Sequence, residues 1–345
     1  MKQAYQKNKK IFMHPSTSSE NFQTFEITNL LPEVGNDEFI KTILDGLLSP
    51  RKYISSIFFY DELGSKLFKE ITNLPEYYIP KLEMQLIKET ASNLQKSLKG
   101  VDIIEFGCGD CSKISIILDA ISKEDLASIR YIPIDISRNS VVETANILSQ
   151  RYANLRIHGI LADFIQQLDL ITYRERKIFC FFGSTIGNLY PDQRVEFCSK
   201  ISNIMQNDDI LLLGVDMVKD RKILNNAYND SLKITERFNK NILNVINNLV
   251  GTTFNPNYFE HVAFFNEKDS RIEMHLKATE NIETYSPYSN KVIRIKRGET
   301  IHTENSYKFT YDHIKHLSEY ANLTIDQIFT DKDSWFSLVK FGKSS

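Results

Sequence analysis

The sequence lacks the features that mark membrane, secreted or nucleic-acid-binding chains. No apolar run approaches the roughly 20 residues that a membrane-spanning helix requires. The 345 residues carry a formal net charge of only −2, so no strong field attracts nucleic acid or an anionic membrane. The first residues contain no apolar stretch of the kind found in a signal peptide. We therefore expect a cytoplasmic protein that binds neither nucleic acid nor membrane.

Cysteine is also scarce. Four cysteines, at positions 108, 111, 180 and 198, are too few for a disulfide framework in a chain of this length. Cys108 and Cys111 form a C-x-x-C pair, as zinc and redox sites do. However, no second pair and no nearby histidine pair completes a tetrahedral set of ligands. We expect no metal.

The most informative segment that is present runs from Asp102 to Lys113, DIIEFGCGDCSK. A short apolar strand ends at a turn with Gly107 and Gly109, and a helical pattern follows. This geometry lets the backbone approach a nucleotide-like ligand closely. The next predicted strand ends at Asp135, where a carboxylate is well placed to accept hydrogen bonds from ribose hydroxyls. The segment therefore predicts an adenosine-bearing cofactor.

The glycine turn lacks the third glycine of the dinucleotide fingerprint. That absence argues against a pyrophosphate seated on the helix N-terminus. S-adenosylmethionine (SAM) has no phosphates and needs no such seat. The turn therefore favours a methyltransferase over a dehydrogenase.

Strands and helices alternate along the middle of the chain, which predicts an α/β fold with a parallel sheet and right-handed crossovers. The expected strands are residues 102–106, 130–137, 155–164, 177–183 and 208–218. The expected helices are residues 84–98, 141–152 and 193–205. Ligands of such sheets gather at the carboxyl ends of the strands.

The alternation stops after Val218. Residues 219–250 have the spacing of one long helix, and 270–278 and 291–299 alternate like two strands facing one another across a polar turn. Residues 323–331 and 335–341 predict an antiparallel pair at the edge of the main sheet. We expect a disordered tail at 1–24, a substrate-binding domain from 25–80 and 219–308, and a methyltransferase domain from 81–218 and 309–345.

The loop GSTIGNLYP, directly after the fourth strand, is a candidate for holding the methyl acceptor. Gly183 offers a tight turn there, and Asn188 offers an amide beside the methyl group. A rival motif, NPNY at 255–258, is similar to the loop of amino-methyltransferases that act on nucleic acid. It departs from that loop at its third position and lies in the insertion, so we do not expect modification of nucleic acid.

Several longer motifs together resemble the histidine Nα-methyltransferase family of ergothioneine biosynthesis. They are FFYDELGSKLF, ITNLPEYYIPKLE, the glycine turn, YIPIDIS, ADF, FFGSTIGN, LLLGVDMVKD, SRIEMHL and IHTENSYKF, and the similarity spans residues 30–343. The resemblance implies a Rossmann-like, seven-stranded SAM-dependent methyltransferase domain with a second α+β substrate-binding domain. It also implies SAM as cofactor, S-adenosylhomocysteine as product and methylation of L-histidine to hercynine.

The resemblance further assigns individual residues. Those implied to bind the cofactor are Gly107, Lys113, Asp135, Asp163 and Phe164. Those implied to bind the amino acid are Tyr60, Phe68, Tyr77, Gly183, Asn188, Tyr228, Thr235, Met274, Glu304 and Ser306. The expected catalytic residues are Tyr60, Asn188 and Tyr228, with Tyr60 as candidate acceptor or relay of the proton that the amine loses.

Glu304 distinguishes the hypothesis of a histidine methyltransferase from the alternative hypotheses. A buried carboxylate can accept the imidazole N–H in a charge-assisted hydrogen bond, whereas relatives that methylate tryptophan need a wide apolar pocket. Met274 and Ser306 are expected to complete the imidazole site. Two alternatives stay open: an N-methyltransferase of tryptophan or another aromatic amino acid, and a module that binds both ligands without turnover. We expect a monomer with a small-molecule substrate.

Overall fold

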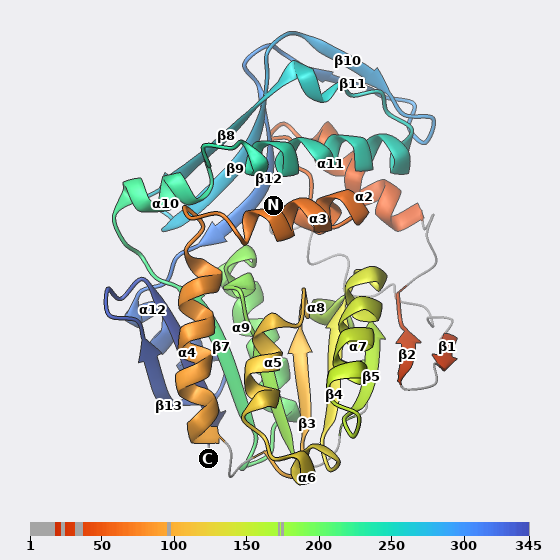
Figure 1. The fold of residues 1–345 in the computed structure, drawn as a ribbon. Helices are drawn as coiled ribbons and strands as arrows, with labels where there is room; N and C mark the ends of the chain where they lie inside the picture. Colours follow the sequence, from red (N-terminus) through yellow and green to blue (C-terminus); the bar gives the residue numbers. More distant parts are fainter. Residues whose placement is uncertain are drawn as a thin grey trace.

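Two lobes make up the described part of the chain (Figure 1). The computed structural model describes residues 18–21, 25–31, 37–94, 98–171, 173 and 176–344. The lower lobe is a large sheet with helices on both faces, and the strands β3 and β4 point toward the upper lobe. The upper lobe therefore faces the carboxyl ends of these strands, the edge at which ligands of such sheets bind.

The large sheet has nine strands in the order β1-β2-β5-β4-β3-β6-β7-β14-β13. Their bounds are β1 Ser18–Asn21, β2 Glu26–Asn29, β3 Asp102–Phe106, β4 Arg130–Asp135, β5 Arg156–Leu161, β6 Lys177–Phe181, β7 Ile210–Asp216, β13 Leu323–Thr330 and β14 Phe336–Lys343. Strands β2 to β7 pair in parallel, while β14 runs antiparallel to β7 and to β13. The α/β fold, the five parallel strands β3 to β7 and the antiparallel pair are as the sequence predicts.

Helices cover both faces of this sheet (Figure 1). One face carries α4 Ile79–Leu94, α5 Ser112–Asp119 and α7 Arg138–Arg151, and the other carries α8 Phe164–Gln167, α9 Pro191–Ile204 and α12 Tyr311–Tyr320. The short elements α6 Lys123–Leu126 and η4 Leu168–Leu170 lie in connections. Because successive side chains of a strand point to opposite faces, Ile103 packs in one core and Ile104 in the other. Burial on both faces explains the nearly continuous apolar runs of β6 and β7.

The N-terminal residues differ from the expectation. Residues 18–21 were expected in a disordered tail and residues 26–29 in the substrate-binding domain, yet they form β1 and β2 and extend the main sheet beyond β5. Backbone hydrogen bonds between β2 and β5 hold the N-terminal strands in the sheet, whereas their largely polar side chains do not predict strands. The rest of the expected tail, 1–17 and 22–24, lies outside the described residues.

The upper lobe combines N-terminal helices with the insertion. Its helices are α2 Asp37–Leu48, η2 Ser56–Phe59, α3 Glu62–Ile71, α10 Arg221–Ala227, α11 Ile234–Val250 and η6 Pro256–Tyr258. Its strands are β8 Phe259–Asn266, β9 Arg271–Ala278, β10 Ile282–Tyr285, β11 Val292–Ile295 and β12 Thr300–Tyr307. Phe59 and Phe238 stack with ring centroids 4.5 Å apart, which joins the two segments.

Two expectations for the insertion are wrong. The predicted long helix is two helices, because Lys233 adopts a left-handed conformation and Asp230 accepts hydrogen bonds from the first backbone amides of α11. The break also removes the regular helical spacing that one continuous helix would give between Tyr228 and Thr235. The predicted pairing of 270–278 with 291–299 also fails, since β9 pairs with β8 and β12 while β11 pairs with β10. Alternation identified the strands but not their partners.

No helix in the described ranges is long and apolar enough to cross a bilayer.

Candidate active site

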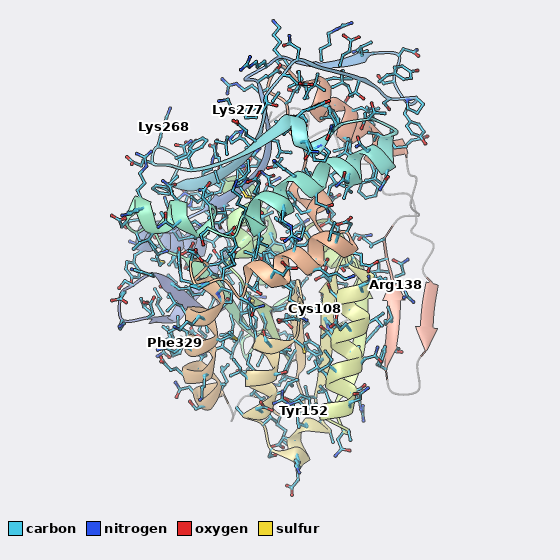
Figure 2. All side chains as sticks on the ribbon, turned by 45° about the horizontal axis from the view of Figure 1, so that its top comes forward. Cys108, Arg138, Tyr152, Lys268, Lys277 and Phe329 are labelled. Carbon is cyan, nitrogen blue, oxygen red and sulfur yellow. The ribbon has the colours of Figure 1, made fainter. Side chains whose placement is uncertain are left out.

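The residues expected to hold the cofactor meet at the carboxyl ends of β3, β4 and β5. They line one cleft of about 3200 Å³ between the lobes. The five are Gly107, Lys113, Asp135, Asp163 and Phe164. Gly107 and Gly109 have φ of +72° and +55°, a region that favours glycine, so the turn after β3 stays close to the cleft without side chains. Figure 2 places Cys108, in this turn, beneath the upper lobe, while Tyr152 lies at the far end of the sheet.

Asp135 ends β4 and accepts a hydrogen bond from the backbone N–H of Ser137, at 2.9 Å. Burial raises the pKa of Asp135 to about 6, although backbone hydrogen bonds oppose that rise. The group is therefore a carboxylate at pH 7, poised to accept hydroxyl donors. Its position at the strand tip agrees with the expected role on a ribose.

Asp163 and Phe164 lie at the start of α8. The Asp163 side chain accepts from the backbone N–H of Ile165 and so caps this helix. Phe164 packs 5.4 Å from Phe106 and 5.5 Å from Phe181, centroid to centroid. One edge of its ring is thus held by the core, and the residue still lines the cleft.

Lys113 is held by a residue that the sequence did not single out. The fully buried carboxylate of Glu83, on α4, lies 2.8 Å from the Lys113 Nζ and accepts the backbone N–H of Gly183 at 2.8 Å. Gly214 leaves room for it, because a Cβ there would come within 2.1 Å of a Glu83 oxygen. Glu83 therefore joins the helix after the glycine turn to the loop that holds Asn188. Nothing in the spacing of α4 distinguishes it from a solvent-facing acid.

The two cysteines of the C-x-x-C pair lie buried in the glycine turn. All four cysteines are free and buried. Burial raises the pKa of the Cys108 thiol well above its usual value, and the Asp135 charge adds to the rise. A thiol in that state is a poor nucleophile and a poor ligand. In the part of the chain that the structure describes, no cysteine belongs to a group of three metal-ligating side chains.

The residues expected to hold the amino acid surround a second, smaller cavity. It measures about 50 Å³ and shares Tyr60, Asn188 and Glu304 with the wall of the cleft. All ten expected residues line it: Tyr60, Phe68, Tyr77, Gly183, Asn188, Tyr228, Thr235, Met274, Glu304 and Ser306. They come from both lobes, so the cavity exists only because the chain folds back on itself.

Glu304 is the acid of this cavity. It lies on β12 opposite Met274 of β9, and the Asn188 amide donates to it at 3.2 Å. Burial raises the pKa of Glu304 to about 7, more than Lys308 and the Asn188 bond lower it. Among the described residues, Asn188 alone donates a hydrogen bond to the Glu304 carboxylate, so Glu304 keeps acceptor capacity for a ligand.

A buried charge network lies behind the cavity, and sequence reasoning missed it. Lys308 is fully buried and its ammonium donates to Asp216 at 2.7 Å, Ser306 at 2.9 Å and Tyr228 at 3.0 Å. Tyr78 and Lys219 also hydrogen-bond Asp216. Burial acts to raise the pKa of Asp216, but the two lysines outweigh it and the pKa is lowered. A lysine after a strand ordinarily faces solvent, so only the fold identifies this network.

The N-terminal part of the chain contributes three aromatic residues to the cavity wall, Tyr60, Phe68 and Tyr77. Tyr60 and Phe68 meet edge to face at 5.7 Å, and Tyr77 meets Tyr228 at 6.0 Å. Burial raises the pKa of Tyr60 well above its ordinary value, and Glu304 adds to the rise. Tyr60 is therefore a neutral phenol at pH 7. Its oxygen can accept an amine N–H as a hydrogen bond, but it holds no resident negative charge to act as a strong base.

Comparison with known proteins bears on what these two adjoining sites do. A family model described as "Histidine-specific methyltransferase, SAM-dependent" matches residues 39–343. The chain belongs to this family. It is a SAM-dependent methyltransferase.

Individual relatives agree with the family model. The "Histidine N-alpha-methyltransferase" of Mycobacterium tuberculosis is 33% identical over 277 residues, covering 80% of this chain and 86% of that protein. That of Mycolicibacterium smegmatis is 33% identical over 293 residues, covering 85% and 91%. The "Ergothioneine biosynthesis protein 1" of Schizosaccharomyces pombe is 29% identical over 229 residues, but these make up only 30% of its length.

Solved structures give a weaker likeness. A SAM-dependent methyltransferase from Clostridium acetobutylicum superimposes with a TM-score of 0.44 at 9% identity, covering 82% of this chain and 97% of that one.

Proposed function

We propose that this histidine-specific methyltransferase family member transfers methyl groups from SAM to the α-amino group of L-histidine. Three successive transfers convert three SAM to three S-adenosylhomocysteine and give hercynine, and the nitrogen releases one proton for each methyl group it gains. This is the first step of ergothioneine biosynthesis. The supporting observation is that Glu304 and Ser306 line the same buried cavity and offer a ligand opposite hydrogen-bonding roles, Glu304 as acceptor and Ser306 as donor. Neutral imidazole carries one N–H donor and one bare nitrogen acceptor, and it needs such a pair.

The roles follow from counting hydrogen bonds. A hydroxyl has one donor and two acceptor positions. Ser306 Oγ accepts from Tyr228 at 2.8 Å and from Lys308 at 2.9 Å, so both acceptor positions are taken. Its own proton is left to point at a ligand. Ser306 thus serves as donor to the bare ring nitrogen while Glu304 accepts the ring N–H.

The α-amino group is proposed to lie toward the cleft. Gly183 and Asn188 line both the cleft and the cavity, so they border the boundary across which a methyl group passes. SAM supplies the electrophilic methyl group when bound. The chain positions the amine for in-line attack, and such positioning supplies several kcal/mol of rate acceleration. Asn188 and Tyr60 are the residues proposed to orient the amine lone pair, and both line the cleft as well as the cavity.

The direct test is mass spectrometry after incubation with SAM and all twenty amino acids. We expect histidine alone to gain methyl groups, ending at three. Methylation of tryptophan in preference to histidine would contradict the proposal and favour an aromatic amino-acid enzyme. Binding of both ligands by calorimetry without any product would favour a non-catalytic module.

Replacing Lys308 with methionine tests whether the two hydrogen bonds accepted by Ser306 fix its hydroxyl as a donor to the ligand. The variant frees an acceptor position on Ser306, so the hydroxyl no longer has a fixed role. We expect histidine affinity to fall by about 1–2 kcal/mol, roughly five- to thirtyfold, measured by calorimetry, with SAM affinity unchanged. Lys219→Met is the matched control, because Lys219 pairs with Asp216 but with neither Ser306 nor Tyr228. Equal losses in the two variants would refute the assigned role.

The domain boundaries, a monomeric state and a cytoplasmic location stay predictions.

A further inference from the structure

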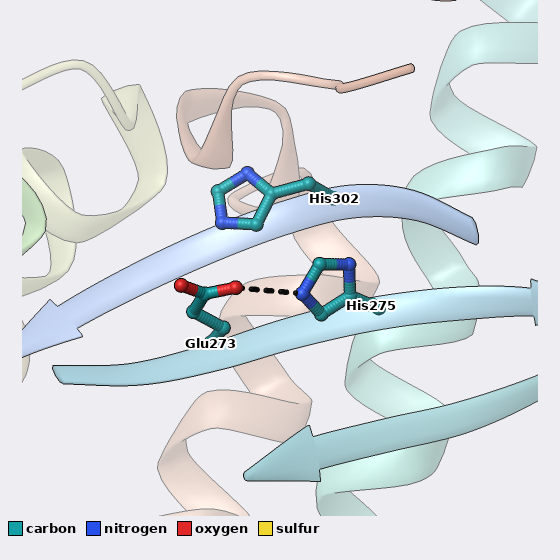
Figure 3. Close-up of side chains that lie close together, drawn as sticks. All are labelled: Glu273, His275 and His302. Carbon is teal, nitrogen blue, oxygen red and sulfur yellow. Dashed lines mark hydrogen bonds and ion pairs between the residues drawn. The ribbon is translucent and has the colours of Figure 1, made fainter. Parts of the chain in front are cut away.

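Three side chains of metal-ligating type converge in the upper lobe (Figure 3). Glu273 and His275 come from β9 and His302 from β12, and one ligand atom of each lies within 4.8 Å of the others. Since side chains alternate along a strand, β9 presents Met274 to the small cavity and its two neighbours to the other face. The large cleft reaches this face.

Backbone register brings the three together. His275 lies directly across from His302, and Glu273 directly across from Asn305. His275 Nε2 is 3.1 Å from a Glu273 oxygen, and His302 Nε2 is 2.9 Å from the Asn305 amide oxygen. Backbone hydrogen bonds from the segment around Tyr53 hold His302 on its other side. The possible ligand atoms of Glu273, His275 and His302 thus face one small region, and the Asn305 amide oxygen lies beside His302.

The carboxylate is already oriented. Arg271 donates to one Glu273 oxygen at 2.6 and 2.8 Å, and Asn266 donates to the same oxygen at 2.9 Å. The second oxygen, Oε2, is the one that faces His275. Outer partners that occupy one oxygen and aim the other are usual around metal-bound carboxylates. The arginine also balances the acid, so the cluster does not depend on a cation for charge neutrality.

We propose that Glu273, His275 and His302 bind one divalent transition-metal ion of the Zn²⁺ class, with the Asn305 amide oxygen or water as a further ligand. Two imidazoles and one carboxylate suit zinc, cobalt or nickel better than magnesium or calcium. Bonds of about 2.1 Å place ligand atoms roughly 3–3.5 Å apart. The side chains therefore close by about 1 Å around the ion, which rotamer adjustments allow. Access is through the cleft.

The consequence is structural support for the substrate cavity. Asn305 lies between Glu304 and Ser306 on β12, and Met274 lies between Glu273 and His275 on β9. An ion on the far face ties the two strands together behind the cavity. The proposal concerns metal binding only, so its test is independent of the test of the proposed methyl transfer.

Calorimetric titration of the full-length chain, free of any histidine tag, with ZnCl₂ tests the site. We expect one ion per chain, and at least tenfold weaker binding in the His275→Ala/His302→Ala double variant. His316→Ala is the matched control, because His316 stacks on Tyr320 of α12 and is no member of the cluster. No binding by the unaltered chain, or unchanged affinity in the double variant, would overturn the proposal.

Anomalous diffraction from a crystal of the unaltered chain soaked in ZnCl₂ keeps the test independent of the variants. A peak within bonding distance of the three side chains is the expected result. Peaks elsewhere only, for example at Cys108 and Cys111, would overturn the assignment even if calorimetry shows one bound ion.

Discussion

Glu304→Ala is expected to weaken histidine binding by about 1.5–3 kcal/mol, the worth of a hydrogen bond to a charged group. That corresponds to about a 10- to 150-fold rise in the dissociation constant, measured by calorimetry at pH 8. The loss has two sources. The ring N–H of histidine loses its acceptor, and the Asn188 amide loses its partner inside a buried cavity. SAM affinity should not change.

The control for this variant is Glu283→Ala. Glu283 pairs with Arg294 on the exposed β10–β11 hairpin, far from the cavity lining. Glu304→Gln keeps the volume and the polarity but presents an N–H₂ toward the ring, so it should bind histidine as poorly as the alanine variant. Wild-type affinity in either Glu304 variant would remove the argument for histidine specificity.

The pH dependence of binding follows from the same residue. Burial raises the pKa of Glu304 to about 7, while free imidazole has a pKa of about 6.5. The proposed complex pairs a carboxylate with a neutral ring. Histidine affinity should therefore rise as pH increases from 6 to 8, and calorimetry across that range checks it. Glu304→Gln should flatten the part of the rise that belongs to the acid.

The stability of the ligand-free protein should fall as pH increases, whereas histidine affinity rises. The pKa of Glu304 is higher in the folded chain than its ordinary value of 4.5. Its contribution to stability is therefore full at low pH and is lost as pH rises through about 7. Glu304→Gln should stabilise the ligand-free protein more at pH 8 than at pH 5, measured by thermal unfolding. Such a trade of stability for function is common at binding sites.

Asp135→Ala is expected to have an effect of similar size, on cofactor binding. Removing the proposed acceptor of the ribose hydroxyls should weaken SAM and S-adenosylhomocysteine binding by about 2–3 kcal/mol, roughly 30- to 150-fold. The fold should persist, because the variant removes a buried acid whose pKa is already raised to about 6. For the unaltered chain, cofactor affinity should fall as pH drops below about 6, where this carboxylate becomes protonated.

Asp312→Ala serves as the control for Asp135→Ala, because Asp312 lies exposed in the first turn of α12 and outside the cleft. Fluorescence or calorimetric titration with S-adenosylhomocysteine measures the difference. Normal cofactor binding by Asp135→Ala would show that the ribose lies elsewhere in the cleft.

The parallel sheet was predictable because its strands are buried on both faces and so form continuous apolar runs, as in β6 and β7. Asp135 could be found without the fold, since parallel strands bring their carboxyl ends to one edge. The substrate residues depended on the family resemblance. Tyr77 and Met274 carry no local signal, and nothing in the sequence shows that they face one cavity.

The errors have local and long-range causes. The break between α10 and α11 arises from Asp230, which caps α11 while the apolar spacing continues on both sides. The partners of β9 depend on contacts distant in sequence, which alternation does not encode. Lys308 and Asp216 were missed because burial of a charged pair depends on tertiary contacts. The buried position of Glu83 was not predicted for the same reason.

The most direct measurement is a crystal structure with S-adenosylhomocysteine and L-histidine bound together. We predict the histidine ring between Glu304 and Ser306, its amino group toward Asn188 and the cofactor sulfur, and the ribose on Asp135. Histidine bound outside that cavity, or seated with its ring toward the cleft and its amino group toward Glu304, would contradict the account.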